Sequence, residues 1–259
     1  MSPRMRLALS IVVVALLASA CATNGGTEPM SAKERTRAAQ ANMQLGVQYL
    51  RRGDLQQALR KLDKAVSQEP DNSDAHMVMG IVYERLDDDD KAAAQYRKAV
   101  SLDGKNSAAQ NNFGRFLCER GHYERAKKLF ERAAANPTYD NPEIPLANAG
   151  VCAMRADKTD EAEDYLLRAL KINPKMPTAL LRMAQLRYEG KQYLSARGYL
   201  QRYLAAAKQT PESAWLGVRI EHKLGDRDAV ASYKLLLNRK FPDSEETRQM
   251  LEWERDGRI

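Results

Sequence analysis

The chain has 259 residues, of which 44% are hydrophobic and 29% are charged, and its formal net charge is +7. Acidic and basic residues alternate in sign, as in Lys61–Leu62–Asp63–Lys64, which is typical of solvated helix faces. Nucleic-acid binding would require a one-signed basic stripe with interleaved aromatic residues, so we expect no nucleic-acid partner.

The N-terminus carries an export signal. Arg4 and Arg6 precede an apolar run from Leu7 to Ala20, which leads directly into Cys21. The run is too short for a transmembrane helix, which needs ~20 apolar residues. We interpret residues 1–20 as a lipoprotein signal peptide and Cys21 as the acylated first residue of the mature chain. The alternative is an ordinary cleaved signal peptide, which would leave Cys21 as a free thiol.

The residues after the cysteine bear on location and on the start of the fold. In the bacterial lipoproteins that this signal resembles, an aspartate after the cysteine favours retention in the inner membrane. Ala22 stands there instead, which implies a lipid-anchored protein on the periplasmic face of the outer membrane. Residues 21–30 are small, polar and broken by Gly and Pro, and predict a flexible tether. Ser31 followed by Glu34 is a capping-box signature, so a helix should begin there.

The rest of the chain repeats with a period of about 34 residues. A small residue recurs at intervals of 34, 34, 36, 34 and 33 residues: Gly46, Gly80, Gly114, Gly150, Ala184 and Gly217. In the first four repeats and in the last, an alanine follows twelve positions later and a leucine, phenylalanine or tyrosine sixteen positions later. This pattern resembles the tetratricopeptide repeat, in which two helices cross at the small residues.

The resemblance implies an all-α fold, a right-handed superhelical solenoid of six helix hairpins with a C-terminal capping helix. We place one repeat domain at residues 31–259. Its repeats span about 39–72, 73–106, 107–142, 143–176, 177–209 and 210–243, and the cap spans 244–259. A final helix from Ser244 to Trp253 should carry Met250, Leu251 and Trp253 on the side that covers the stack.

Local signals mark the turns within this pattern. Asp54, Asp88 and Thr159 are the expected N-caps of the second helices in their repeats. The fifth repeat departs most from the pattern and lacks a closing proline at the usual place. It therefore predicts a distorted or lengthened junction near Lys208.

The junction between the third and fourth repeats is irregular and is flanked by two cysteines. Segment 136–145 contains three prolines and predicts an extended turn with Tyr139 packed against the stack. It is either a stiff spacer or a docking loop for a partner. Cys118 and Cys152 lie in adjacent first helices, and an exported protein meets an oxidising compartment, so we expect a disulfide between them. The alternative is two buried thiols that behave as small hydrophobic residues.

The sequence shows no catalytic constellation. His76 stands at a helix position where a packing role is expected, His122 lies in a turn, and His222 lies late in a helix. These scattered histidines lack metal-site spacing, and Asp87–Asp90 lacks the central glycine and final glutamate of a calcium loop. We therefore expect no metal, no cofactor, no small-molecule substrate and no enzymatic activity.

Function is then expected on the concave surface, which the first helices of the repeats line. By analogy with the repeat family, the residues of this partner-binding groove are Met43, Val47, Leu50, Met77, Ile81, Arg85, Arg115, Val151 and Met154. Flexible methionines with charged neighbours suit the docking of a helix or strand from a protein partner. The alternative is that several of these side chains pack against the segment that begins at Ser31.

Three stretches carry a more specific resemblance. They are Asn112–Gly121, the turn with Pro137, Tyr139 and Pro142, and Asn148–Ala153. They resemble the type IV pilus biogenesis and stability lipoproteins of the PilF/PilW family, the pilotins, and the likeness covers essentially the whole mature chain. The resemblance implies a protein that binds the type IV pilus secretin subunit, promotes its outer-membrane localisation or multimerisation, and supports twitching motility. The alternatives are a periplasmic lipoprotein adaptor for cell-wall hydrolases and a component of the outer-membrane assembly machinery.

Overall fold

The computed structural model describes residues 30–259. The signal peptide predicted at 1–20, the acylation site predicted at Cys21 and the tether up to residue 29 lie outside the described residues. Across the described part of the chain, no helix combines the length and the apolar character needed to cross a membrane.

Thirteen helices follow one another through residues 30–259, and no strand occurs in that range. They are α2 (Ala32–Arg52), α3 (Leu55–Gln68), α4 (Ser73–Arg85), α5 (Asp89–Leu102), α6 (Ser107–Glu119), α7 (Tyr123–Ala135), α8 (Glu143–Arg155), α9 (Thr159–Ile172), α10 (Pro177–Glu189), α11 (Tyr193–Ala206), α12 (Pro211–Leu224), α13 (Arg227–Lys240) and α14 (Glu245–Arg255). Consecutive helices pack as six hairpins, from α2/α3 to α12/α13, and α14 follows alone. The predicted all-α solenoid of six hairpins with a C-terminal capping helix is confirmed.

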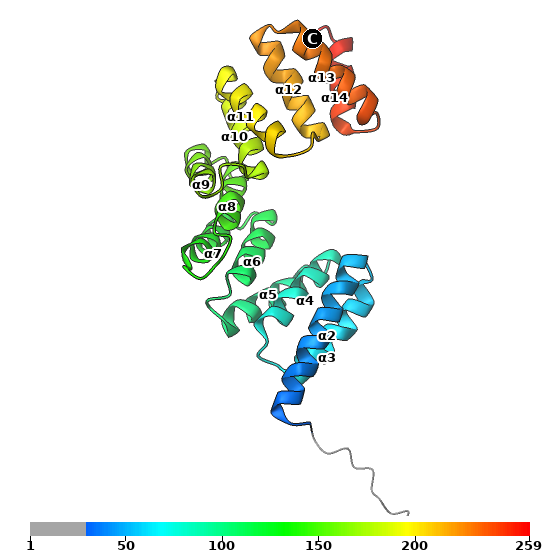
Figure 1. Ribbon diagram of the computed structural model, residues 1–259, viewed down its shortest axis with the longest axis vertical. Helices are drawn as coiled ribbons and strands as arrows, with labels where there is room; N and C mark the ends of the chain where they lie inside the picture. The colour runs from blue at the N-terminus through cyan, green and yellow to red at the C-terminus, as the bar shows by residue number, and fades with distance from the viewer. Residues whose placement is uncertain (1–29) are drawn as a thin grey trace, which may run out of the picture.

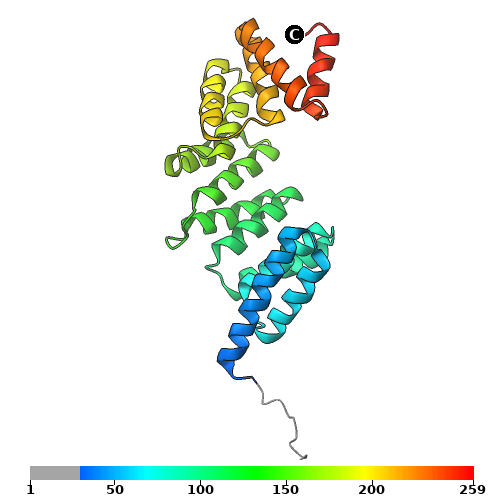
Figure 2. The same ribbon diagram turned by 45° about the vertical axis from the view of Figure 1, so that its right-hand side comes forward.

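The hairpins stack along a curved axis (Figures 1 and 2). Each first helix also contacts the first helix of the next hairpin, from α2 with α4 to α10 with α12. In the middle of the arc, α6 and α8 lie on the inner side and α7 and α9 on the outer side (Figure 1). We call the surface formed by α2, α4, α6, α8, α10 and α12 the A-helix face.

The recurring glycine lets the two helices of a hairpin approach closely. A Cβ atom on Gly46 would lie 2.7 Å from Leu62 Cγ, and one on Gly150 would lie 2.6 Å from Leu166 Cγ. Ordinary carbon contacts are about 3.5–4.0 Å, so the facing side chain fills the space that a methyl group would take. The same contact joins Gly80 with Tyr96, Gly114 with Phe130, and Gly217 with Tyr233. This is the physical reason why the small residue and the bulky residue recur together.

Side-chain caps start several helices where the sequence predicts them. The amide of Glu34 donates to the Ser31 hydroxyl at 3.3 Å, and the Glu34 carboxylate accepts from the Ser31 amide at 2.8 Å, which confirms the capping box. Asp54 accepts from an amide of α3 and Asp88 from an amide of α5, each at 3.1 Å. Each cap satisfies a backbone donor that the first turn of a helix leaves unpaired.

The prediction of Thr159 as the N-cap of α9 is wrong. The helix begins at Thr159, and Lys158 is the residue before it. The Lys158 carbonyl accepts the first helical bond, from the Ala162 amide, at 2.9 Å. Asp157 already makes the preceding turn with a positive φ of 54°, so the chain is helical one residue earlier than expected.

The junction near Lys208 is distorted but not lengthened. Residues 207–210 join α11 to α12 and are as many as residues 69–72, which join α3 to α4. The backbone is extended at Ala207 and at Thr210, with ψ of 162° at both. The Tyr203 hydroxyl donates to the Lys208 carbonyl at 3.1 Å and ties this loop to α11.

The third and fourth hairpins are joined by a longer loop and by a covalent link. The loop runs from residue 136 to residue 142, and Tyr139 is half-buried in it. Burial, followed by the charge of Glu143, raises the pKa of the Tyr139 hydroxyl. Cys118 on α6 and Cys152 on α8 form a disulfide in the structure, with their Cα atoms 5.7 Å apart.

Helix α14 covers the C-terminal end of the stack (Figure 2). Met250 is fully buried, and the Trp253 ring meets the Trp215 ring of α12 edge-on at 4.9 Å between centroids. The prediction that Leu251 joins them is wrong, because that side chain is 48% exposed. Neighbouring helix residues are about 100° apart around the axis, so Met250 and Leu251 point in different directions.

Candidate partner-binding face

The groove residues predicted from the sequence divide into three sections along the A-helix face. The first is the apolar section of Met43, Val47, Leu50, Met77 and Ile81 on α2 and α4. The second is the ionic section of Arg85, Arg115 and their partners on α4 and α6. The third is a hollow between α8 and α10 that includes Val151 and Met154.

The apolar section belongs to the core of the first two hairpins. Leu50 is 7% exposed, whereas Met43, Val47, Met77 and Ile81 are half-buried and pack around that core. The segment from Ser31 onward is the start of α2 itself, so Met43 and Val47 stand on the same helix as that segment. These side chains therefore form a partly exposed apolar surface on α2 and α4.

Salt bridges and hydrogen bonds occupy the ionic section. The Arg115 guanidinium donates to both Glu84 oxygens and to Glu119, each at 2.8 Å. The Tyr96 hydroxyl, on α5, donates to Glu84 at 2.7 Å. Burial, followed by the charge of Glu84, raises the pKa of that hydroxyl.

The Arg85 side chain also binds a group of the neighbouring first helix. Its Nη1 donates to the carbonyl of Leu50 at 3.0 Å, near the C-terminus of α2. That carbonyl is among the last of the helix, where intrahelical partners run out. Arg85 and Arg115 thus tie neighbouring first helices together across the A-helix face.

The hollow has a volume of about 370 Å³. Val151 and Met154 of α8 face Leu186 of α10 across it, and polar side chains complete its lining: Arg155, Asp157, Thr159, Arg182, Gln185 and Glu189. Several of the polar groups bind one another, as Gln185 donates to Glu189 at 3.0 Å and Arg182 pairs with Glu212 of α12. The hollow therefore combines apolar side chains from both helices with polar side chains that are held by hydrogen bonds and a salt bridge.

Sequence reasoning missed Arg219 on α12, which is outside the lining of the hollow but stacks on Tyr188 of α10, the helix that supplies one side of the hollow. Its guanidinium carbon is 5.0 Å from the centroid of the Tyr188 ring and 5.6 Å from that of Trp215. A signal was present in the repeat, because two positions after the small residue the second to fifth hairpins carry apolar or sulfur-containing residues. These are Val82, Phe116, Cys152 and Leu186.

His76 and His122 belong to none of these three sections. His76 is 7% exposed, and its ring nitrogens contact Gln95 Oε1 at 2.7 Å and the Pro70 carbonyl at 3.0 Å, which is the expected packing role. His122 precedes α7 and makes no capping bond through its side chain.

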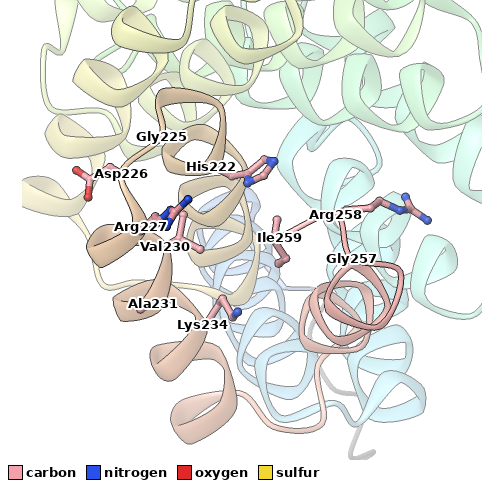
Figure 3. A pocket seen from close by; sticks show the side chains of 10 residues that line it. All are labelled: His222, Gly225, Asp226, Arg227, Val230, Ala231, Lys234, Gly257, Arg258 and Ile259. Carbon is pink, nitrogen blue, oxygen red and sulfur yellow. The ribbon is translucent and has the colours of Figure 1, made fainter.

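A second hollow, of about 590 Å³, lies at the C-terminal end between α12, α13 and Gly257–Ile259 (Figure 3). His222, Val230 and Ile259 surround it, whereas Asp226 points away. Asp226 caps α13 through the Ala229 amide at 3.0 Å, and Lys234, also in the lining, pairs with Glu254. This hollow lies beyond the predicted groove, and three of its charged groups, Asp226, Lys234 and Arg258, are engaged within the fold.

Comparison with known proteins gives consistent results. Models of the tetratricopeptide repeat match residues 43–109 and 111–177, and a second model of the same repeat matches 153–216. The type IV pilus assembly protein PilF of Pseudomonas aeruginosa is 33% identical over 240 residues, which is 92% of this chain and 95% of that protein. An uncharacterised protein of Haemophilus influenzae is 30% identical over 167 residues, which is 64% of this chain and 91% of that one.

Two solved structures are similar over most of the chain. The structure of P. aeruginosa PilF has a TM-score of 0.77 and 33% identity, and covers 85% of this chain and 99% of its own. The structure of PilW, described as a widely conserved type IV pilus biogenesis factor, has a TM-score of 0.76 and 31% identity, and covers 82% and 98%.

Proposed function

Because the chain belongs to the family of tetratricopeptide-repeat proteins that includes PilF and PilW, we propose that it acts in type IV pilus biogenesis by binding a protein partner. Within that role, the proposed partner is the pilus secretin subunit. The chain would promote the localisation of this subunit to the outer membrane and its multimerisation there. Its part in this process is binding, with no catalytic step.

The observation that supports this proposal most is the extent of the likeness to PilF. It covers 92% of this chain and 95% of that protein, so it extends over most of the solenoid and is not confined to a shared fragment. Repeat proteins of this kind offer an extended inner surface on which a client segment can lie.

The apolar section supports binding at the N-terminal end of the A-helix face. Its methionines, Met43 and Met77, are unbranched and polarisable, so they can adapt to the surface of a partner helix or strand. Half-buried apolar side chains are already held in place by the core beneath them, so little conformational entropy is lost when a partner covers them.

The proposed location is the periplasmic face of the outer membrane, with Cys21 as the anchor. Acyl chains contribute about 0.8 kcal/mol per buried methylene, so two or three chains give a stable attachment. The anchor would hold the solenoid where secretin subunits reach the membrane.

The test is deletion of the gene followed by complementation. Loss of the protein should reduce secretin multimers in outer-membrane fractions and reduce surface pili, and the wild-type gene should restore both. A Cys21→Ser variant separates anchoring from binding, because it should still bind the secretin subunit in solution while multimers fall in the outer membrane. Normal multimers and normal pili in the deletion strain would exclude the proposal.

A further inference from the structure

Arg219 is a half-buried cation that forms no salt bridge among residues 30–259, although the charges of Glu189 and Glu212 act on it from farther away. It stands two positions after the small residue of its hairpin, where the first hairpin carries Gln48. At the equivalent position the second to fifth hairpins bury their side chains to 7% exposure or less: Val82, Phe116, Cys152 and Leu186. In the sixth hairpin an arginine stands there, and burial lowers the pKa of its guanidinium. Partly burying a charge that forms no salt bridge costs stability, so packing alone does not explain an arginine here.

The aromatic rings of Tyr188 and Trp215 fix this side chain. They lie on neighbouring first helices, α10 and α12, and the guanidinium carbon is within 6 Å of both ring centroids, at 5.0 Å and 5.6 Å. Cation–π contacts orient the planar group but leave its hydrogen-bond donors unused. Among residues 30–259, Nε of Arg219 is buried and has no hydrogen-bond partner.

The acidic groups nearby are engaged elsewhere. Glu212 pairs with Arg182, and Glu189 accepts a hydrogen bond from Gln185 at 3.0 Å. Within the described chain, no carboxylate lies within 4 Å of the Arg219 guanidinium. The side chain is therefore oriented and partly desolvated. Its Nε is covered by the protein, so Nη1 and Nη2, which form no hydrogen bond among the described residues, are the pair of donors left for a carboxylate.

We propose that Arg219 binds a carboxylate side chain of a protein segment whose apolar residue occupies the hollow between α8 and α10. The hollow supplies the apolar contact through Val151, Met154 and Leu186. Packed helices lie about 10 Å apart, and an extended chain rises about 3.3 Å per residue, so the two contacts are separated by roughly three residues. The partner is thus an acidic–apolar segment that crosses α10.

This inference rests on the proposed function in one respect, since it takes the A-helix face to be where a protein partner binds. The probe for it is independent of the secretin. It is a short fluorescein-labelled peptide of alternating leucine and glutamate, with a matched peptide in which glutamine replaces every glutamate. Binding of both to the full chain in detergent is measured by fluorescence anisotropy.

The wild-type protein should bind the glutamate peptide about tenfold more tightly than the glutamine peptide, the typical effect of one charge-assisted hydrogen-bonded pair. Arg219→Met should abolish that preference. Because methionine suits the apolar position, this variant should stay folded and have a urea midpoint at or above that of the wild type. Loss of the glutamate preference without loss of stability would show that Arg219 acts in binding and is not needed for folding.

The matched control is Arg202→Met on α11. Arg202 is also stacked on a tyrosine, with its guanidinium carbon 5.3 Å from the Tyr199 centroid, but it belongs to a second helix of a hairpin. This variant should keep the wild-type preference for glutamate.

Equal binding of the two peptides to the wild-type protein, or an undiminished preference in a folded Arg219→Met variant, would overturn the inference. Capture of the secretin subunit is measured separately with the same proteins. A glutamate preference without secretin capture would reject the proposed partner and leave the carboxylate site standing. Secretin capture without a glutamate preference would reject the carboxylate site and leave the proposed partner standing.

Discussion

The guanidinium of Arg115 on α6 binds the carboxylate of Glu84 on α4 through two hydrogen bonds, each 2.8 Å long. The Glu84 side chain is only 13% exposed and also accepts a hydrogen bond from the Tyr96 hydroxyl. This one carboxylate therefore joins the second hairpin to the third.

Replacing Glu84 by alanine should destabilise the stack. The change removes the acceptor of three hydrogen bonds, two from Arg115 and one from Tyr96, and breaking such a partly buried network costs about 2–4 kcal/mol of unfolding free energy. Urea denaturation followed by circular dichroism measures it. As a control, Asp164→Ala removes an exposed partner of Arg168 and should change the stability by less than about 1 kcal/mol. Equal effects of the two substitutions would contradict the network.

Stability should also fall at alkaline pH because of Tyr96. Burial and the charge of Glu84 raise the pKa of its hydroxyl in the folded state, whereas in the unfolded chain it ionises near its usual value of about 10. A raised folded pKa gives stability that is complete below pH about 10 and is lost as the pH rises above it.

The comparison that isolates this effect is with Tyr96→Phe. Urea midpoints of the wild type should decline more steeply than those of the variant between about pH 9.5 and pH 11, because only the wild type carries this group. Other titrating residues are common to both proteins. Parallel declines would show that Tyr96 does not contribute.

Gly150 should not tolerate a methyl group. In Gly150→Ala the new Cβ would lie 2.6 Å from Leu166 Cγ and 3.2 Å from the Ala162 carbonyl oxygen, so the hairpin must open, at a cost of about 1–3 kcal/mol. Gly198 on α11 is the matched control, since a Cβ there meets no atom within 4 Å. Gly198→Ala should stabilise the protein by about 0.5–1 kcal/mol. A shift of the thermal unfolding midpoint in the same direction for both variants would argue against close packing at Gly150.

The cysteine pair should be oxidised in the exported protein. Intact mass should rise by two hydrogens on reduction, and Cys118→Ser with Cys152→Ser should lower stability by about 3–4 kcal/mol, as is typical for a loop of this length. Reduced wild type and the double variant should unfold at similar urea concentrations. An unchanged mass after reduction would favour the two buried thiols.

A charge in the apolar section should weaken binding to the secretin subunit. Met77→Glu places a carboxylate among half-buried apolar side chains, and we expect at least about a tenfold loss of affinity in a solution binding assay. Leu194→Glu is the control, because that residue is 72% exposed on α11, outside the A-helix face. Undiminished affinity of a folded Met77→Glu protein would place the contact elsewhere on the chain.

The order of the helices could be predicted because each hairpin is specified locally. A glycine that must face a bulky residue sixteen positions later, as Gly46 faces Leu62, leaves a periodic trace in the sequence. Caps such as Asp54 are similarly local. The prediction of Thr159 as a cap failed by one residue because the backbone at Asp157, and not the identity of the capping side chain, decides where α9 begins.

The groove was predicted less completely, because contacts between hairpins depend on how neighbouring helices are rotated. Arg115 and Glu84 are 31 residues apart, and nothing in the spacing says that their side chains meet. The structure shows that this arginine is engaged with Glu84. Arg219 could have been found from the repeat alignment, since it is the one charged residue at a position that holds Gln48 in the first hairpin and apolar or sulfur-containing residues in the second to fifth.

The link between Cys118 and Cys152 has a mechanical consequence. When tension is applied to the two ends of a solenoid, every junction between hairpins carries it in series. The junction between α6/α7 and α8/α9 is the one closed by a covalent bond among the described residues, so the neighbouring junctions should yield before it. The middle of the stack would then move as a single block, and a pull on one end would reach the other end through it.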